Sequence, residues 1–219
     1  AWAPFLEMRF FIGKEWLGNW DIEAVNKSDN AGEPLEKVVQ KLTGVGIEEA
    51  MKFCPQCGNE LVIAQVDGKP RQKCPSEFCN YVFWNNPIPV VGAITELNGD
   101  VILVRNKQWP EKIFGLVTGF LEKGETPEEG ILREVREELG LEAKIVDFVG
   151  YYSFFQMNQL ILVFHIKAEG KIVMGEELVE TKPVPPEKLR PWRFGTGYAV
   201  ADWLKTWKAT GANPSLKKD

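Results

Sequence analysis

The chain has 219 residues, of which 44% are hydrophobic and 26% charged, and its net charge at pH 7 is −5. These values are typical of a soluble globular protein with one large domain, or one domain with small appendages. No apolar run approaches the roughly eighteen residues of a membrane helix, and the N-terminus lacks the basic start and apolar core of a signal peptide. The negative charge disfavours a general nucleic-acid binder, since phosphate backbones attract an excess of Lys and Arg. We therefore expect a soluble protein of cytoplasmic type.

Residues 1–50 form an N-terminal extension that is rich in aromatic side chains. These are Trp2, Phe5, Phe10, Phe11, Trp16 and Trp20. Pro34 opens a short predicted helix whose apolar face comprises Leu35, Val38, Val39 and Leu42. We interpret the extension as a segment that packs on the rest of the chain or on a second subunit. The alternative is that its aromatic side chains stack on a substrate base.

All four cysteines lie in residues 51–84, in two short pairs with sixteen residues between them: Cys54 and Cys57, then Cys74 and Cys79. Two such pairs joined by a hairpin can bring four thiolates to one Zn²⁺, and Asp67-Gly68 is a hairpin-turn signal. The segment is therefore predicted to form a zinc ribbon with structural zinc. Two disulfides are the alternative, which we disfavour because nothing indicates an oxidising compartment.

Residues 85–210 are predicted to form a second domain that begins with a β-hairpin. The β-branched run Val90–Thr95 predicts a strand, Asn98-Gly99 a tight turn, and Val101–Val104 the return strand. Trp109 follows in a loop that either closes over a substrate or packs on its own scaffold.

The segment 119–141, GFLEKGETPEEGILREVREELGL, contains a predicted helix that starts at Pro127. Thr126 is a suitable N-cap, Pro127 suits the first turn, and Gly140 is a suitable C-cap glycine. Apolar residues recur at helical spacing and supply the buried face: Ile131, Leu132, Val135 and Leu139.

Three carboxylates share another face of this helix, because Glu134, Glu137 and Glu138 stand at i, i+3 and i+4. Like charges at this spacing repel, so a helix selected only for stability would alternate them with Lys. Such a group of carboxylate oxygens suits a hard divalent cation, and Mg²⁺ especially. Arg133 is placed to pair with Glu125 or Glu137 and to hold the group together.

Beyond this helix, Ala143–Val149 predicts a strand, and residues 151–170 predict one or two strands, of which Leu160–Ile166 is buried on both faces. The only histidine, His165, lies in this buried segment and is interpreted as a strand residue rather than a ligand or base. Residues 197–208 predict an amphipathic helix, and residues 211–219 a frayed tail. Mixed strands flanked by two helices predict an α/β sandwich.

Gly119, Glu125 and the run REVREELGL at 133–141 match every fixed position in the signature of the Nudix hydrolases, which this chain resembles. The resemblance covers roughly residues 54–207. It implies the Nudix α/β/α sandwich with a mixed sheet, preceded here by the zinc ribbon. It also implies divalent-metal-dependent hydrolysis of a nucleoside diphosphate linked to another moiety, to a nucleoside monophosphate and a phosphorylated product.

The same resemblance implies roles for the helix residues. Glu134 and Glu138 would be the principal Mg²⁺ or Mn²⁺ ligands, with Glu137 in support and the backbone carbonyl of Thr118 completing the site. The group that deprotonates the attacking water varies within the family and stays open.

Other acidic and basic residues receive supporting roles from the resemblance. Arg133 and Glu125 would orient the carboxylates. A further acidic ligand comes from a later loop in this family, and Glu177 is the first candidate here, with Glu180 the second.

A four-cysteine ribbon before a Nudix domain resembles the NADH pyrophosphatase branch of the family. That branch carries the signature Ser-Gln-Pro-Trp-Pro-Phe-Pro-x-Ser after the catalytic helix, where this chain reads YYSFFQMNQL, without the prolines and the tryptophan. The Trp84-Asn85-Asn86-Pro87 link and the Asn158-Gln159 pair are more similar to relatives that act on ADP-ribose or FAD. We therefore expect ADP-ribose or FAD as substrate, with NADH as the alternative.

The expected partners are a small nucleotide and a second copy of the chain, with residues 1–50 as a dimer interface. A function of another class is a non-catalytic module that binds nucleotide or RNA. Lys69, Arg71 and Lys73 provide only a small basic patch for RNA, and intact helix carboxylates disfavour a domain without catalysis.

Overall fold

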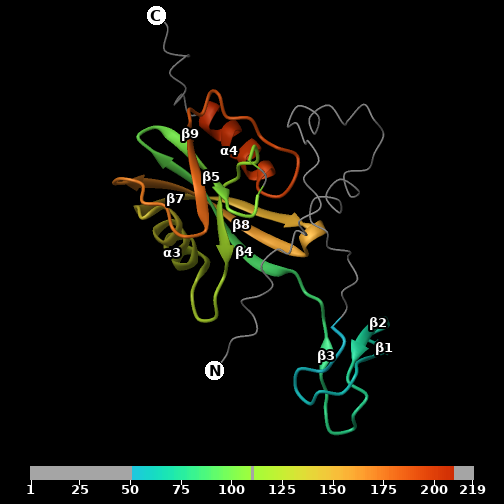
Figure 1. Cartoon of the computed structure of the whole chain (residues 1–219). Coiled ribbons are helices and arrows are strands. Elements are labelled where there is room, and N and C mark those ends of the chain that lie inside the picture. The colour runs from blue at the N-terminus through green and yellow to red at the C-terminus, as the bar shows by residue number, and fades with distance from the viewer. Residues whose placement is uncertain (1–50, 110, 210–219) are drawn as a thin grey trace, which may run out of the picture.

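The computed structural model describes residues 51–109 and 111–209, which form two β-sheets and two α-helices (Figure 1). The aromatic residues of the extension, the helix predicted from Pro34 and the tail at 211–219 lie outside the described residues. In the described ranges, neither α-helix combines the length and apolar character required to span a membrane.

The N-terminal sheet has three short antiparallel strands in the order β1 (Val62–Val66), β2 (Lys69–Lys73) and β3 (Val82–Phe83). Asp67 and Gly68 connect β1 and β2 with φ values of 51° and 75°, which confirms the predicted hairpin turn. Its small core consists of Cys54, Leu61, Cys74 and Cys79. Three of the four cysteines therefore provide much of what this sheet buries.

The larger sheet has six strands: β4 (Ile88–Leu97), β5 (Asp100–Asn106), β6 (Val117–Phe120), β7 (Glu142–Phe154), β8 (Gln159–Glu169) and β9 (Leu178–Val184). The order is β7-β8-β4-β5-β9, and β6 pairs with β4. The β4–β8 pair is parallel and the other pairs are antiparallel, so the sheet is mixed. The predicted turn at Asn98-Gly99 joins β4 to β5 and is confirmed by their antiparallel pairing.

The helices α3 (Pro127–Leu139) and α4 (Gly197–Ala209) cover opposite faces of this sheet. Alternate residues of β4 show this arrangement, because a strand points successive side chains to opposite faces. Val91 and Ala93 pack in the core under α3, whereas Val90 and Ile94 pack in the core under α4. The predicted α/β/α sandwich with a mixed sheet is confirmed.

Strand β7 extends beyond the predicted strand and ends in a short 3-10 turn, η2 (Phe155–Met157). The turn leads directly into β8, whose segment 160–166 has no exposed side chain. Two irregularities interrupt the pairing of β7 with β8, between Ile145 and Asp147 and between Phe148 and Gly150. Irregularities of this kind bend an edge strand and break its period of two.

Candidate functional site

Helix α3 starts and ends at the residues expected from the sequence. The Thr126 hydroxyl accepts a hydrogen bond from the Glu129 N–H (3.2 Å), and the Glu129 carboxylate accepts one from the Thr126 N–H (2.8 Å), which forms a capping box. Gly140 follows the helix with φ 65°, and its N–H donates to the carbonyl oxygen of Arg136. The helix register that places the carboxylates is therefore fixed at both ends by local contacts.

Arg133 lies at the centre of the charged group and makes the contacts predicted for it. Its guanidinium donates to both carboxylate oxygens of Glu125 (3.0 and 2.7 Å), to Glu134 (2.7 Å) and to Glu137 (3.1 Å). It also donates to the carbonyl oxygen of Phe120 (3.2 Å), which ties the helix to the end of β6. The hydrogen bonds from Arg133 lower the pKa of the Glu125 carboxyl below its ordinary value.

Glu134 and Glu138 are partly buried, and this burial is the largest cause of the raised pKa of each carboxyl. For Glu138 the pKa rises to about 8, because the negative charges of Glu134, Glu177 and Glu137 add to the effect of burial. A divalent cation at this position would relieve both causes by compensating the negative charge. The carboxylates therefore fit a Mg²⁺ or Mn²⁺ site.

The backbone of β6 forms the other side of this group. A Cβ atom on Gly119 would overlap the carboxylate of Glu134, so the absence of a side chain at 119 provides the space that Glu134 occupies. Thr118 precedes Gly119 on β6 and pairs with Gly92 of β4. The glycine of the sequence motif thus has a steric role in placing a carboxylate.

Glu177 acts electrostatically on the carboxylates of α3, since its negative charge contributes to the raised pKa of both Glu134 and Glu138. Its carbonyl oxygen accepts a hydrogen bond from the Lys107 N–H (2.9 Å). Glu180, the second candidate, lies on β9 and binds the Arg105 guanidinium through two hydrogen bonds of 3.1 and 3.0 Å.

The loop before Glu177 contacts the C-terminal end of α3 through backbone groups. The Val173 N–H donates to the Leu139 carbonyl, and the Gly175 N–H donates to the Glu138 carbonyl; each hydrogen bond is 2.8 Å long. Sequence reasoning missed Val173 and Gly175. The only sequence signal for Gly175 is its residue type, because glycine permits a close approach of backbone segments.

Trp109 packs on its own scaffold rather than over a substrate site. A Cβ atom on Gly115 would lie 3.0 Å from two atoms of the Trp109 ring, so the indole lies against the Gly115 backbone. This contact agrees with the second of the two sequence interpretations.

A cavity of about 280 Å³ lies where the end of β7 and the turn η2 meet the segment before α4. It is lined by Ser153, Phe154, Phe155, Gln156, Arg193, Phe194, Gly195 and Tyr198. Phe154 and Phe194 contact each other with ring centroids 6.2 Å apart. The lining thus combines aromatic faces with hydrogen-bond donors, which suits a flat, polar-edged group.

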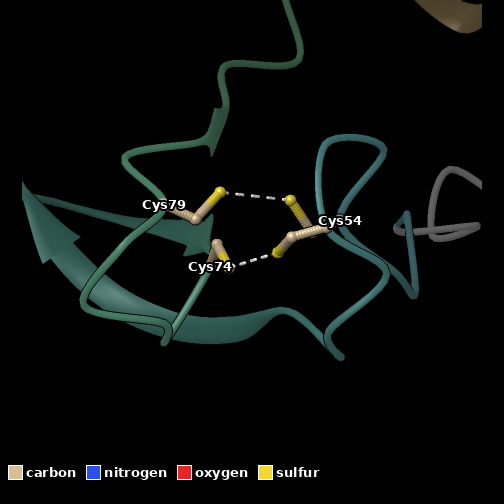
Figure 2. A group of neighbouring side chains, drawn as sticks. Cys54, Cys74 and Cys79 are labelled. Atoms are coloured by element: carbon tan, nitrogen blue, oxygen red, sulfur yellow. Dashed lines mark hydrogen bonds between the residues drawn. The ribbon is translucent and has the colours of Figure 1, made fainter.

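The four cysteine sulfurs lie within 4.8 Å of one another, and the side chains labelled in Figure 2 point toward a common centre. The Sγ atoms of Cys54 and Cys79 are 3.6 Å apart and those of Cys57 and Cys74 are 3.4 Å apart, so none of the four cysteines forms a disulfide. A tetrahedron around Zn²⁺ with bonds of about 2.3 Å has edges of about 3.8 Å. The cysteine arrangement therefore fits a structural Zn²⁺.

Comparisons with known proteins agree with this geometry. The chain is 29% identical over 130 residues to "NAD-capped RNA hydrolase NudC" of Pseudomonas aeruginosa, a match that covers 59% of this chain and 45% of that protein. The corresponding protein of Pseudomonas fluorescens is 27% identical over 130 residues, which cover 46% of it. The chain thus spans about half the length of the curated relatives it matches.

Structural similarity points the same way. A Nudix hydrolase from Nitrosomonas europaea has a similar crystal structure, with a TM-score of 0.63, 26% sequence identity, and coverage of 74% of this chain and 94% of that one. The family model for the NUDIX domain matches residues 86–203, which is more than half of the chain. The chain belongs to the Nudix family.

Proposed function

We propose that this chain hydrolyses a nucleoside diphosphate linked to another moiety, with ADP-ribose or FAD favoured, in the presence of Mg²⁺ or Mn²⁺. The observation that supports this most strongly is the pair Glu134 and Glu138 on one face of α3, where partial burial, and then the charges of neighbouring carboxylates including Glu177, raise the pKa of both. Such a group costs stability in a protein without a cation, and perturbed carboxylates cluster at functional sites.

The residues of the site have separable tasks in this proposal. When bound, Mg²⁺ or Mn²⁺ would neutralise the diphosphate charge and lower the pKa of water. Glu134, Glu138 and Glu177 would hold the cation, with Glu137 and the carbonyl of Thr118 in support. Arg133 orients the carboxylates through its bonds to Glu134 and Glu137 and is itself held by Glu125.

The reaction that these groups support is attack of water on one phosphorus of the diphosphate. The bond between that phosphorus and the bridging oxygen breaks, and the bridging oxygen leaves with the other phosphate. Water supplies the new oxygen of the attacked phosphate, and its proton is released. ADP-ribose would yield AMP and ribose 5-phosphate.

The aromatic cavity is proposed to bind one end of the substrate. Strand register relates it to the carboxylates, because Tyr152, Ile161, Val90 and Phe120 lie opposite one another across β7, β8, β4 and β6. These are three strand spacings of about 4.8 Å each, or about 14 Å. The carboxylates lie on α3 and the cavity adjoins α4 on the other face, so we propose that the substrate passes the edge of the sheet at β6, with its phosphates near Gly119 and an aromatic group in the cavity.

NADH or an NAD-capped RNA end is the second candidate substrate, favoured by the names of the Pseudomonas relatives. The region where the NADH pyrophosphatase signature would fall forms the end of β7, η2 and the start of β8. Phe154 and Phe155 line the cavity from this region. Because these side chains replace the signature residues, we favour ADP-ribose or FAD over NADH.

A substrate screen tests the proposal. Purified chain with Mg²⁺ or Mn²⁺ is incubated with ADP-ribose, FAD, NADH, NAD-capped RNA and nucleoside triphosphates, and nucleoside monophosphates are measured by chromatography. Glu138→Gln should lower turnover of the preferred substrate at least about 100-fold. Glu128→Gln, an exchange on the exposed first turn of the same helix, should keep wild-type turnover. If wild type is no faster than Glu138→Gln on every substrate, a nucleotide-binding module becomes the better interpretation.

We also propose that the cysteines bind structural zinc and that residues 1–50 contribute to a homodimer. Metal analysis should find zinc in wild-type protein and a loss of it in Cys74→Ser. Light scattering should give the mass of two chains, and a monomer mass would refute the dimer.

A further inference from the structure

One asparagine connects the linker after the ribbon to the wall of the aromatic cavity. Asn158 follows η2 with φ 48°, and its N–H donates to the Phe155 carbonyl (3.1 Å) while its own carbonyl accepts from the Ile88 N–H (2.8 Å). Its side-chain amide donates to the Asn85 side-chain oxygen (2.9 Å) and lies 3.4 and 3.3 Å from the carbonyl oxygens of Asn85 and Asn86. Asn158 therefore binds residues 85–88 through two of its groups, the side-chain amide and the backbone carbonyl.

The other end of this linker is held by the ribbon. The Arg71 guanidinium of β2 donates to the carbonyl oxygen of Trp84 (2.7 Å) and lies over the Trp84 ring, 4.9 Å from its centroid. Cys74 directly follows β2, and Asn85 directly follows Trp84. Figure 1 shows this linker as the chain segment between β3 and β4. A path of side-chain contacts and chain connections therefore leads from β2, which ends next to Cys74, through Trp84 and Asn85 to Asn158.

The cavity wall next to Asn158 needs such support. Phe155 and Gln156 line the cavity from η2, which has only three residues. A single 3-10 turn has weak hydrogen bonds and does not hold its own position. The bonds of Asn158 to the linker thus set where this wall stands.

Closing the turn does not by itself require these side-chain contacts. Asn98 adopts the same left-handed conformation (φ 54°) in the β4–β5 turn. In the described part of the chain, the side-chain amide of Asn98 makes no hydrogen bond. Asn158 uses the same backbone conformation and adds an amide directed at the linker.

We propose that Asn158 is a positioning residue through which the zinc ribbon holds the cavity wall formed by Phe155 and Gln156. The ribbon then contributes to substrate affinity and not to the chemical step. This inference rests on the proposed role of the cavity in binding one end of the substrate.

The first test is Asn158→Gly, which retains the left-handed backbone without strain and removes only the amide. With the preferred nucleotide of the screen, KM should rise about five-fold, in line with the loss of one hydrogen-bonded support. The kcat should stay at the wild-type value, because the carboxylates are untouched. Asn98→Gly makes the same exchange in a matching turn and should change neither constant.

The second test asks whether the ribbon acts through Asn158. Arg71→Ala, checked for unchanged zinc content, should also raise KM, and Arg71→Ala with Asn158→Gly should raise it no further than Asn158→Gly alone. An unchanged KM in folded Asn158→Gly, or effects that multiply in the double variant, would overturn the proposal.

A binding measurement separates this inference from the proposed reaction. If wild type hydrolyses no nucleotide in the screen, calorimetric titration with ADP-ribose replaces KM. About five-fold weaker binding by Asn158→Gly would then support the wall-positioning role although the hydrolase proposal had failed. A wild type that neither hydrolyses nor binds any of the nucleotides refutes both.

Discussion

The backbone N–H of Gly175 donates a hydrogen bond of 2.8 Å to the carbonyl oxygen of Glu138. Glu138 is a proposed metal ligand, and Gly175 lies two residues before Glu177, another proposed ligand. A Cβ atom on Gly175 would overlap the carbonyl oxygen of Glu137. Gly175 is not among the residues with positive φ. Glycine is therefore needed at this position because a side chain would not fit, and not because of the backbone conformation. This contact therefore ties the backbone that leads to Glu177 to the backbone of Glu138.

Gly175→Ala should displace the loop from α3 and weaken Mn²⁺ binding about ten-fold, as changes to residues that orient metal ligands commonly do. Electron paramagnetic resonance of free Mn²⁺ during a titration measures this without any substrate. Met174→Ala, at a half-exposed neighbouring position, serves as the control and should keep wild-type affinity. Equal affinities in Gly175→Ala and wild type would show that the loop does not place Glu177.

Gly119→Ala should lower kcat by about 100-fold, because displacing a catalytic carboxylate by about 1 Å has effects of this size. The added methyl group would overlap the Glu134 carboxylate. Gly92→Ala is a matched control on the paired strand β4, where a Cβ would lie 3.5 Å from its nearest neighbours, an ordinary contact. Steady-state kinetics of both variants decide the matter, and comparable losses in the two would contradict a specific role for the space at Gly119.

Arg133→Lys should reduce the free energy of unfolding by about 1 to 3 kcal/mol. An ammonium group cannot replace a guanidinium that binds three carboxylates, so the exchange leaves some of these carboxylates without a hydrogen-bond donor. The measurement is the urea midpoint with an unchanged m-value. Arg136→Lys is the control, because within residues 51–109 and 111–209 the Arg136 side chain makes only an exposed 3.4 Å ion pair with Glu142, and such pairs contribute little. If both exchanges shift the urea midpoint equally, the contact of Arg133 with three carboxylates contributes no more to stability than the exposed ion pair of Arg136.

Features of this chain that arise from local contacts could be predicted from the sequence. The caps Thr126 and Gly140 bound α3 as expected, because a capping side chain or a left-handed glycine contacts residues within one turn. The common face of Glu134 and Glu138 follows from the same helical geometry.

Features that depend on distant contacts could not be predicted. Asn158 and Asn85 are 73 residues apart, and no periodicity links the two positions. The C-terminal half of β7 was hard to delimit for another reason, since its irregular pairing near Asp147 and Gly150 removes the alternation that identifies a strand. Both features that the sequence does not predict lie around the aromatic cavity. The sequence therefore indicates the reaction more directly than it indicates the substrate.

The pH dependence of stability should carry a contribution from His165. Its Nε2 lies 3.1 Å from a Glu96 carboxylate oxygen, and its ring lies 5.3 Å from the Trp203 ring, centroid to centroid. Burial is the largest cause acting on this imidazole and lowers its pKa below the ordinary value, although Glu96 opposes the shift. The unfolded chain therefore binds a proton at His165 more readily than the folded chain does.

As pH falls below about 6.5, this difference should reduce the stability of the folded state, and the loss should level off below the folded pKa. The slope from one proton cannot exceed about 1.4 kcal/mol per pH unit. Urea unfolding of wild type and His165→Gln between pH 7.5 and 5 measures the difference, because Gln keeps a hydrogen-bonding group at 165 but cannot titrate. Relative to the variant, wild type should lose stability on acidification. A relative gain for wild type would mean that the Glu96 contact outweighs burial and that the pKa shift has the opposite sign.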